Sequence, residues 1–326
     1  MAATVRPRRP PVRTLIEMAD LLNRRLVYVT GKGGVGKTTV AAALGLAAAR
    51  AGKRTLVCEV AEQERITTAF GHEPAGFSEV EVAPDLSAFS IDPEAAKQEW
   101  LGHQLRSGRL ASVLNSSRIF QYLTAAAPGL AEVVTMGKIW ELAQLQRRTK
   151  SARPYDLVVV DAPATGNGLA LLRAPRTFAQ IAKVGPIGNH AKTIHDFTVD
   201  PRHSAVIAVA LAEEMPVNET IDLEGRLRDQ MGLELSHVFV NGVLPERFSA
   251  AEVEAIAFAN GDAGPVAREA LDAALIAHER GKAQRTQVAR LRRGTKAPVA
   301  VLPFLLTPEL DLEGLQELSR EVERRL

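Results

Sequence analysis

Hydrophobic residues along this chain occur in two patterns: short uninterrupted runs, and longer stretches in which apolar positions recur every three or four residues. The longer stretches predict helices that alternate with the runs. Such alternation is typical of an α/β protein with a doubly wound, mostly parallel sheet. The short runs predict strands over residues 26–30, 53–60, 155–161, 204–210, 234–240 and 297–302, and two shorter pieces within 80–92, separated by 83–85.

The predicted helices vary in length. The longest helical region covers residues 93–150, with a break at 127–129, and residues 184–190 break the chain before the strand at 204. We therefore expect one domain over 26–326 with a helical insert at about 93–150. The other predicted helices are 40–50, 169–183, one opening at 216–220, one from 250, 266–291 and 312–326. The last should dock through Leu312, Leu315, Leu318 and Val322.

Composition narrows the classes of protein. The 326 residues carry a formal net charge of +2, which gives no electrostatic reason to expect nucleic acid as a partner. The single cysteine, Cys58, excludes an internal disulfide, and its apolar neighbours favour a buried strand position. No apolar run approaches the roughly 20 residues that span a bilayer. We expect a cytoplasmic protein with at most peripheral membrane contact and a basic, flexible segment over residues 1–25.

Residues 31–39, with the sequence GKGGVGKTT, follow the first strand directly and open a helix. They match the phosphate-binding pattern G-x-x-x-x-G-K-[ST], in which bare backbone curls around a phosphate with its N–H groups inward. We expect Lys37 to reach the β- and γ-phosphates of ATP, Thr38 to ligate Mg²⁺ and Thr39 to contact the α-phosphate. The remaining contacts should come from the backbone of Gly33, Gly34, Val35 and Gly36.

Asp161 stands at the carboxyl end of the predicted strand 155–161. In a parallel sheet this end lies beside the phosphate loop, where a carboxylate can hold a Mg²⁺-bound water close to Thr38. A helix N-cap or a turn residue is the alternative for Asp161. The phosphate loop favours the metal role, and catalysis is then expected to rest on Lys37 and Asp161.

Lys32 directly follows the first glycine, which makes the loop a deviant Walker A loop, and residues 161–168 read DAPATGNG. On these residues the chain resembles the dimeric P-loop ATPases that include the arsenite-pump ATPase, the ATPases for guided entry of tail-anchored proteins, and the cell-division and partition ATPases. The resemblance implies that Lys32 crosses a dimer interface to the partner's nucleotide and so joins Lys37 and Asp161 as a catalytic residue, with a solvated charge as the alternative. It also implies that the Gly166 N–H faces the γ-phosphate. Asn167 stands where the family usually has histidine.

Further roles follow from the same resemblance. Asn241, at the tip of the predicted strand 234–240, matches the family position that reads the adenine edge, with capping of the next turn as the alternative. Pro303 and Phe304 lie in a segment like the family's adenine loop. The helices of the insert match a region that carries a hydrophobic client groove in the tail-anchored targeting ATPases, although an ordinary helical core explains the same spacing equally well.

The expected function is that of an ATPase in which nucleotide state controls closure of a homodimer, or of a heterodimer with a paralogous ATPase, and binding of a client or partner. Capture of arsenite is disfavoured because soft metalloids need several thiolates and only Cys58 is present. Two alternatives stay open: a partition or division ATPase, and a low-turnover regulatory subunit paired with a paralogue.

The loop after the second predicted strand departs from the family pattern. Counting back from Phe70 without a gap places Ala61 where the family has the aspartate that orients the attacking water. Glu59 or Glu62 could take its place if the loop is shifted. The sequence therefore predicts intact nucleotide binding and slow hydrolysis by the isolated chain.

Overall fold

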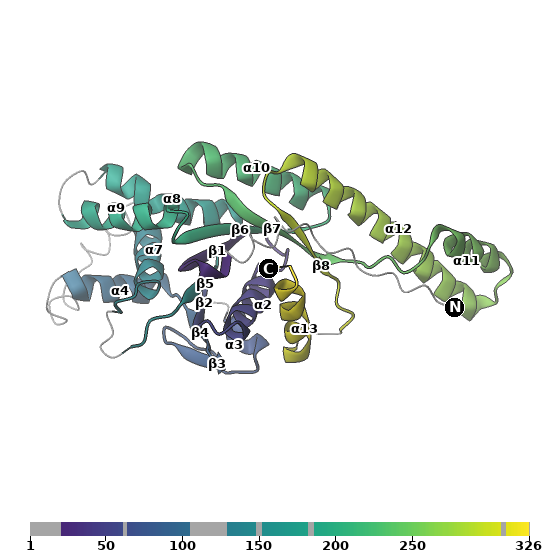
Figure 1. Cartoon of the computed structure of the whole chain (residues 1–326), viewed down its shortest axis with the longest axis horizontal. Coiled ribbons are helices and arrows are strands. Elements are labelled where there is room, and N and C mark those ends of the chain that lie inside the picture. The colour runs from purple at the N-terminus through teal and green to yellow at the C-terminus, as the bar shows by residue number, and fades with distance from the viewer. Residues whose placement is uncertain are drawn as a thin grey trace.

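The structure, a computed structural model, describes residues 21–60, 64–104, 129–147, 152–181, 186–307 and 311–325. The strands within these ranges form a single eight-stranded sheet (Figure 1). In chain order they are β1 (Leu26–Thr30), β2 (Thr55–Glu59), β3 (Val80–Ala83), β4 (Leu86–Ser90), β5 (Leu157–Asp161), β6 (Ser204–Leu211), β7 (Leu235–Val243) and β8 (Val299–Pro303).

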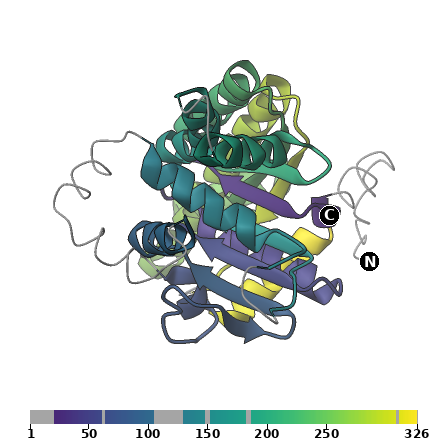
Figure 2. The ribbon, with the colours of Figure 1, turned by 90° about the vertical axis from the view of Figure 1, so that its left-hand side faces the viewer.

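Helices connect most of these strands and cover both sides of the sheet (Figure 2). Those in the described ranges are the 3₁₀ turn η1 (Leu21–Asn23), α2 (Lys37–Arg50), α3 (Arg65–Ala69), α4 (Pro93–Gln104), α7 (Leu130–Leu142), α8 (Thr165–Ile181), α9 (Pro186–Val199), α10 (Glu214–Met231), α11 (Ala250–Asp262), α12 (Pro265–Gly294) and α13 (Leu312–Glu323).

The sheet has the order β3-β4-β2-β5-β1-β6-β7-β8, and every neighbouring pair is parallel except β3 with β4. The predicted α/β fold with a mostly parallel sheet is therefore confirmed. β1 lies between β5 and β6, with Val29 opposite Asp161 on one side and opposite Ile207 on the other. Because parallel strands end at one edge, this pairing brings the loop after β1 and the end of β5 together.

Two hydrophobic cores lie on the two faces of the sheet. On one face, α2 packs under α13, and the ten residues from Val40 to Ala49 are all buried. Small side chains allow this close contact, and a helix surrounded on all sides has no polar stripe. On the other face, α7, α8, α10 and the inner part of α12 cover the alternate residues of the same strands. Cys58 points into this second core and is fully buried, as its sequence context predicts.

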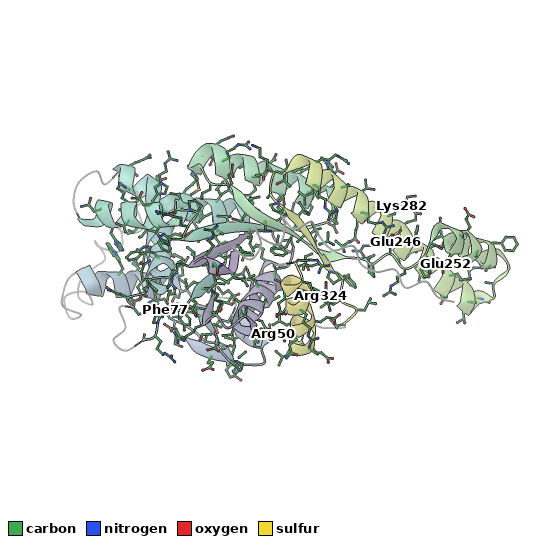
Figure 3. The ribbon with its side chains drawn as sticks, viewed as in Figure 1. Arg50, Phe77, Glu246, Glu252, Lys282 and Arg324 are labelled. Atoms are coloured by element: carbon green, nitrogen blue, oxygen red, sulfur yellow. The ribbon has the colours of Figure 1, made fainter. Side chains whose placement is uncertain are left out.

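The helices α11 and α12 form an arm that points away from the sheet (Figure 1). Buried residues of α12 occur only in its inner part, where Gly281, Gln284, Val288 and Leu291 contact the body. We define the arm as α11 together with the outer part of α12, up to Arg280; it has no buried residue within the described positions. Glu252 marks α11 in Figure 3, and Glu246 lies in the segment that leads to it. Its exposed apolar side chains include Phe258 at 81%, Val266 at 82% and Ile276 at 68% exposure.

Some predicted elements were wrong. Residues 186–190, expected to interrupt the chain, open α9, because a proline is tolerated in a first turn whose N–H groups have no partner anyway. Ala191, Ile194 and Thr198 then give that helix a buried side at helical spacing. α2 begins at Lys37 and not at residue 40. The terminal helix docks through Leu315, Leu318 and Val322 as expected, whereas Leu312 is 44% exposed.

Other predictions fall outside the described residues. These concern residues 1–20 of the basic N-terminal segment, the middle of the helical insert at 105–128, and residues 61–63 of the loop that follows β2. What the structure describes of the insert is α4 and α7, which contact each other and contribute Ala96, Val134, Met136 and Ile139 to the second core.

Candidate nucleotide site

The phosphate loop runs from the end of β1 to the start of α2 and requires glycine at specific points. Gly36 is the N-cap of α2 in the left-handed region, with φ 89°, and a Cβ there would lie 2.3 Å from Asn241 Nδ2. A Cβ on Gly31 would lie 2.2 Å from the carbonyl oxygen of Val209. No atom would meet a Cβ on Gly33 or Gly34 within 4 Å. The loop is thus held tightly at its ends and is open between them, as a phosphate cradle must be.

Lys37 extends from the first turn of α2 back over the loop. Its ammonium group donates a hydrogen bond to the carbonyl oxygen of Lys32 at 3.0 Å. Burial lowers the pKa of Lys37, and the nearby Asp161 carboxylate raises it. A half-buried cation on bare backbone, in front of a helix N-terminus, attracts a polyanion.

Thr38 and Asp161 meet at the point predicted for the metal. The Thr38 hydroxyl donates to Asp161 Oδ2 at 2.5 Å. Asp161 is 6% exposed, and burial raises its pKa to about 6, against the lowering effects of Thr38, Lys37 and Arg65. Within the described part of the chain its second oxygen, Oδ1, is buried and accepts no hydrogen bond. A buried carboxylate oxygen without a donor, next to a hydroxyl, suits a hard cation such as Mg²⁺.

The start of α8 is tied to the phosphate loop. The Thr165 N–H donates to the carbonyl oxygen of Gly31 at 3.0 Å, and the Tyr28 hydroxyl of β1 donates to the carbonyl oxygen of Gly168 at 3.0 Å. Gly166 lies in the first turn, where backbone N–H groups have no intrahelical acceptor. The N–H of Gly166 is therefore available to an anion, as its expected role needs. Asn167 is exposed.

Lys32 makes an interaction that its motif does not reveal. Its ammonium nitrogen lies 2.6 Å from Glu219 Oε1, on α10, and the two side chains are 31% and 39% exposed. The carboxylate holds the lysine on the surface near the loop, within the same chain. The role of Lys32 in a dimer stays a prediction.

Asn241 contacts the phosphate loop. It lies inside β7 and not beyond the strand's end, and its amide donates to the carbonyl oxygen of Val35 at 3.1 Å. Pro303 ends β8, and the Phe304 N–H donates to the carbonyl oxygen of Val243 at 3.0 Å, next to the end of β7. Asn241 and Phe304 thus lie near the carboxyl ends of two adjacent strands. Their adenine contacts stay a prediction.

Sequence reasoning did not place Glu59 and Arg65 together beside the phosphate loop. Glu59 ends β2 directly opposite Asp161 of β5, and Arg65 begins α3 and lines a cavity of about 260 Å³ with Gly34, Lys37 and Thr38. Glu59 is 5% exposed, and burial raises its pKa to about 7. A carboxylate at the end of a buried apolar run was a usable signal for Glu59. Arg65 lies in no motif, and only the fold brings it to the loop.

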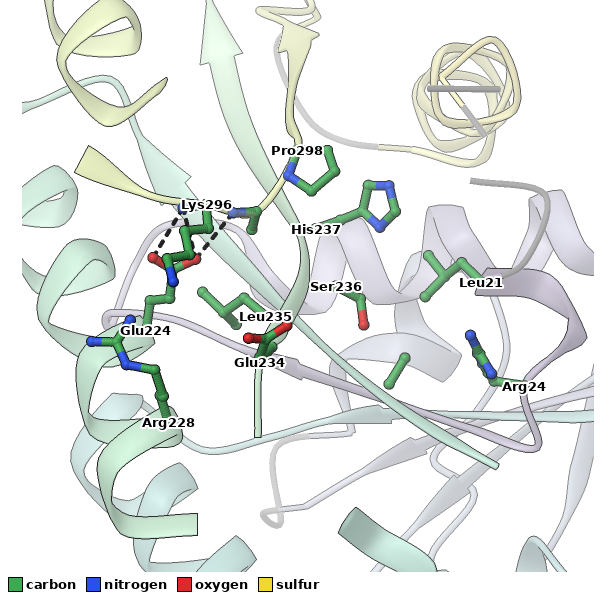
Figure 4. Close-up of a pocket in the computed structure, with 12 residues that line it drawn as sticks. Leu21, Arg24, Glu224, Arg228, Glu234, Leu235, Ser236, His237, Lys296 and Pro298 are labelled. Carbon is green, nitrogen blue, oxygen red and sulfur yellow. Dashed lines mark hydrogen bonds between the residues drawn. The ribbon is translucent and has the colours of Figure 1, made fainter. Parts of the chain in front are cut away.

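A larger cavity, of about 330 Å³, lies elsewhere (Figure 4). Its lining includes Leu235 and Pro298, at the amino ends of β7 and β8, and so it opens at the edge of the sheet opposite the phosphate loop. The Glu224 carboxylate beside it accepts bonds from the Thr295 hydroxyl and from the Lys296 and Ala297 N–H groups. These bonds fix the chain before β8, which is a structural task.

Two negative findings concern the described residues. Among them, no group of three or more histidine, cysteine, aspartate or glutamate side chains could hold a metal ion. His190 lies against the Trp140 ring, and His203 stacks on Phe197. None of the described helices is both long and apolar enough to cross a membrane.

The position of the phosphate loop defines the class of the protein. The loop follows the central parallel strand β1, and its Thr38 is bonded to Asp161 of the neighbouring strand β5. P-loop nucleoside triphosphatases have this arrangement. Residues 24–191, just over half of the chain, match the family of anion-transporting ATPases. The chain therefore belongs to this family, as its resemblance to the arsenite-pump and tail-anchored targeting ATPases led us to expect, and its reaction is ATP hydrolysis.

Individual relatives support the same assignment. The chain is 32% identical to the ATPase BagA of Mycobacterium tuberculosis over 91% of its own length and 92% of that protein. It is 28% identical to the ATPase GET3 of Chaetomium globosum, over 54% of its own length and 50% of that protein. Similarity to the first of these relatives extends over nearly the whole chain.

Proposed function

We propose that this chain is a dimeric, Mg²⁺-dependent ATPase in which nucleotide state controls dimer closure and the binding of a client or partner protein. The observation that carries the proposal is the convergence of Lys37, Thr38 and Asp161 on an open glycine loop. Lys37 balances phosphate charge, while Thr38 and Asp161 would hold the metal. When bound, Mg²⁺ would neutralise charge on the β- and γ-phosphates.

Dimer closure is assigned to Lys32. In the isolated chain it is held by Glu219 of α10, on a partly exposed surface. An exposed ion pair contributes little, about 0–1 kcal/mol, so a partner's phosphate can replace Glu219 as the counter-charge of Lys32. The homodimer and the heterodimer with a paralogous ATPase are both compatible with this surface.

A low-turnover regulatory subunit is the second candidate, and Ala61 is the observation that favours it. An alanine where the resemblance places the water-orienting aspartate leaves phosphate and metal binding intact and removes one catalytic group. In that case the chain would act mainly through its nucleotide-dependent shape, and a paralogue would supply the faster site.

Substitution of the phosphate lysine tests the main proposal. Lys37→Ala should abolish ATP binding in calorimetry with Mg²⁺, because the β- and γ-phosphates lose their balancing charge. Lys192→Ala is the matched control, since Lys192 is an exposed lysine of α9 paired with Asp196. ATP should also raise the molar mass of the wild-type protein in light scattering if the dimer closes on nucleotide. Undiminished ATP affinity in Lys37→Ala would contradict the assignment of the loop.

A further inference from the structure

Arg65 is the first residue of α3, and its side chain lines the cavity in front of the phosphate loop. The cavity of about 260 Å³ is also lined by Gly34, Gly36, Lys37 and Thr38, the residues expected to surround the phosphates. Arg65 lies 26 positions after Thr39, the last residue of the loop, and the pairing of β2 beside β5 brings the two segments together. A second cation therefore faces the space intended for a polyanion.

The carboxylates of Asp161 and Glu59 act on the charge of Arg65 from a distance, but neither forms a direct ion pair with its guanidinium group. Arg65 is exposed, and in the described part of the chain no carboxylate forms an ion pair with it. Its charge nevertheless acts on the site. The charge of Arg65 lowers the pKa of Lys37, in addition to the lowering by burial and against the raising effect of Asp161. Arg65 and Lys37 therefore lie within electrostatic reach of each other. Two cations face one cavity here, and the buried Asp161 carboxylate is the anion that acts on both, so the cavity favours a phosphate ligand.

The backbone that carries Arg65 is fixed on both sides. Glu59, buried at the end of β2, accepts the Ile66 N–H through Oε2 at 3.3 Å. Glu64, the residue before Arg65, has φ 44°, a left-handed conformation that is uncommon for a non-glycine residue. Its side chain accepts the Gly76 N–H at 3.2 Å. Strained backbone of this kind persists only where its surroundings hold it, and it is frequent at ligand-binding positions.

We propose that Arg65 binds the polyphosphate of the nucleotide from the α3 side of the cavity, and that Glu59 is the positioning residue that holds the first turn of α3 in place. Side-chain alternation along β2 supports the second part: Val57 and Glu59 point to the face of the sheet that carries α2, as do Val159 and Asp161. Glu59 and Asp161 thus stand side by side, one directed to α3 and the other to Thr38.

This inference rests on the proposed function, because it adds a binding residue to the same nucleotide site. The chemistry of the Arg65 side chain differs from that of Lys37. A guanidinium offers a planar fork of donors that can bind two phosphate oxygens at once, whereas an ammonium acts as a point charge. Arg65 would therefore fix the orientation of the phosphates as well as neutralise their charge.

Calorimetry with Mg²⁺ and a non-hydrolysable ATP analogue tests Arg65. Arg65→Gln should weaken binding about 10- to 100-fold, the effect of losing one charge-assisted hydrogen-bonded contact. Arg65→Lys should lose less than Arg65→Gln, because it keeps the charge and not the fork. The matched control is Arg280→Gln, an exposed arginine of α12 outside the site. Arg65→Gln with the affinity of the wild type would overturn the proposal.

Two Glu59 variants test the positioning role. Glu59→Gln keeps an oxygen that can accept the Ile66 N–H and should bind the analogue nearly as well as the wild type. Glu59→Ala removes that acceptor and should weaken binding to a similar degree as Arg65→Gln. Circular dichroism melting of both variants shows whether they are folded. Equal and normal affinity in both would mean that Glu59 does not position α3.

The same measurements separate this inference from the proposed function. A wild-type protein that binds neither ATP nor its analogue would end both. Loss of binding in Lys37→Ala together with full affinity in Arg65→Gln would keep the phosphate loop and remove Arg65 from the site. Wild-type binding that both Arg65→Gln and Lys37→Ala weaken supports both.

Discussion

At the scale of single residues, the ion pair between Lys32 and Glu219 raises the question of what happens when it opens. The pair joins the phosphate loop to α10 in one chain. If Lys32 serves the nucleotide of a second subunit, Glu219 competes for it. The pair would then set how much nucleotide is needed before the dimer closes.

We therefore expect Lys32→Ala to bind ATP like the wild type and to lose ATP-stabilised dimerisation, because the lysine reaches across the interface and does not hold its own nucleotide. Glu219→Gln should favour the dimer at lower ATP concentration, since it frees Lys32. Calorimetry measures the first property, and sedimentation velocity the second. If Lys32→Ala loses nucleotide affinity as completely as Lys37→Ala, the division of roles between the two lysines is wrong.

Ala61 gives a second expectation at this scale. The isolated chain should hydrolyse ATP slowly, because a well-positioned group that orients water can contribute several kcal/mol, and alanine cannot do so. Ala61→Asp should raise phosphate release at unchanged ATP affinity. The control is the unmodified protein, assayed like the variant in the absence of any paralogous ATPase. Fast turnover by the unmodified protein that disappears in Glu59→Gln would show instead that Glu59 is the missing carboxylate.

The buried carboxylates predict how stability depends on pH. Burial raises the pKa of Asp161 from 3.8 to about 6 and that of Glu59 from 4.5 to about 7, so the folded state favours their protonated forms. As pH rises between the ordinary and the raised values, both groups ionise in the unfolded chain while the fold still holds them protonated, so the metal-free protein loses stability. The loss is on the order of 2–3 kcal/mol per group.

Urea unfolding of the nucleotide-free protein in a chelator, at pH 5 and at pH 8, measures this dependence. Glu59→Gln and Asp161→Asn should each flatten it, because the amides do not titrate. Mg²⁺ with ADP should restore stability at pH 8 in the wild type and less in Asp161→Asn. A wild-type protein that becomes more stable from pH 5 to pH 8 without metal would contradict the raised pKa values.

How far the site could be predicted from the sequence depended on whether its residues are close along the chain. The loop from Gly31 to Thr39 forms a continuous motif, and Asp161 follows a clear apolar run, so both could be proposed from the sequence. Asn241 was placed at the right strand, but its bond to the carbonyl oxygen of Val35 needs the sheet order β1-β6-β7. Arg65 and the Lys32–Glu219 pair depend wholly on packing between distant segments.

At the scale of elements, the arm formed by α11 and the outer part of α12 is the region that packing against the body stabilises least, because none of its described residues is buried. Sequence periodicity predicted both helices, but it could not show that one of them would leave the body. Their apolar positions, such as Phe258 and Ile276, look like core residues in the sequence and are exposed in the structure. The inner part of α12 is different, because Gln284 donates to the carbonyl oxygen of Gly242 and accepts the Leu244 N–H.

Removal of the arm should therefore leave the rest of the fold intact. Replacing residues 250–279 by a short glycine-serine linker should change the free energy of unfolding by less than about 1 kcal/mol, because no buried side chain is lost. Nucleotide affinity should also be unchanged. Gln284→Ala is the contrasting variant and should cost about 1–3 kcal/mol, since it leaves two backbone groups without partners. A shortened protein that cannot fold would show that the arm stabilises the body.

At the scale of the whole molecule, the nucleotide site is the meeting point of five strands. β1, β2, β5, β6 and β7 end at one edge of the sheet, and the segments that follow them carry the loop, α3, the start of α8 and α10. The two faces have separate cores, with α2 and α13 on one and α7, α8 and α10 on the other. A change at the phosphates can therefore reach both layers through α2 and through α8.

The position of the single sulfur atom has a practical consequence. Cys58 lies in β2 between β4 and β5, with no exposed surface, and burial raises the pKa of its thiol. A thiol reagent in native buffer can reach it only when the second core opens, between the sheet and the helices that cover it, so the labelling rate reports that opening and not a surface fluctuation. Because the chain has no other cysteine, one chromogenic signal follows one event. A bound nucleotide would slow the labelling by the factor 1 + [L]/Kd, and a simple absorbance trace would then serve as a binding titration.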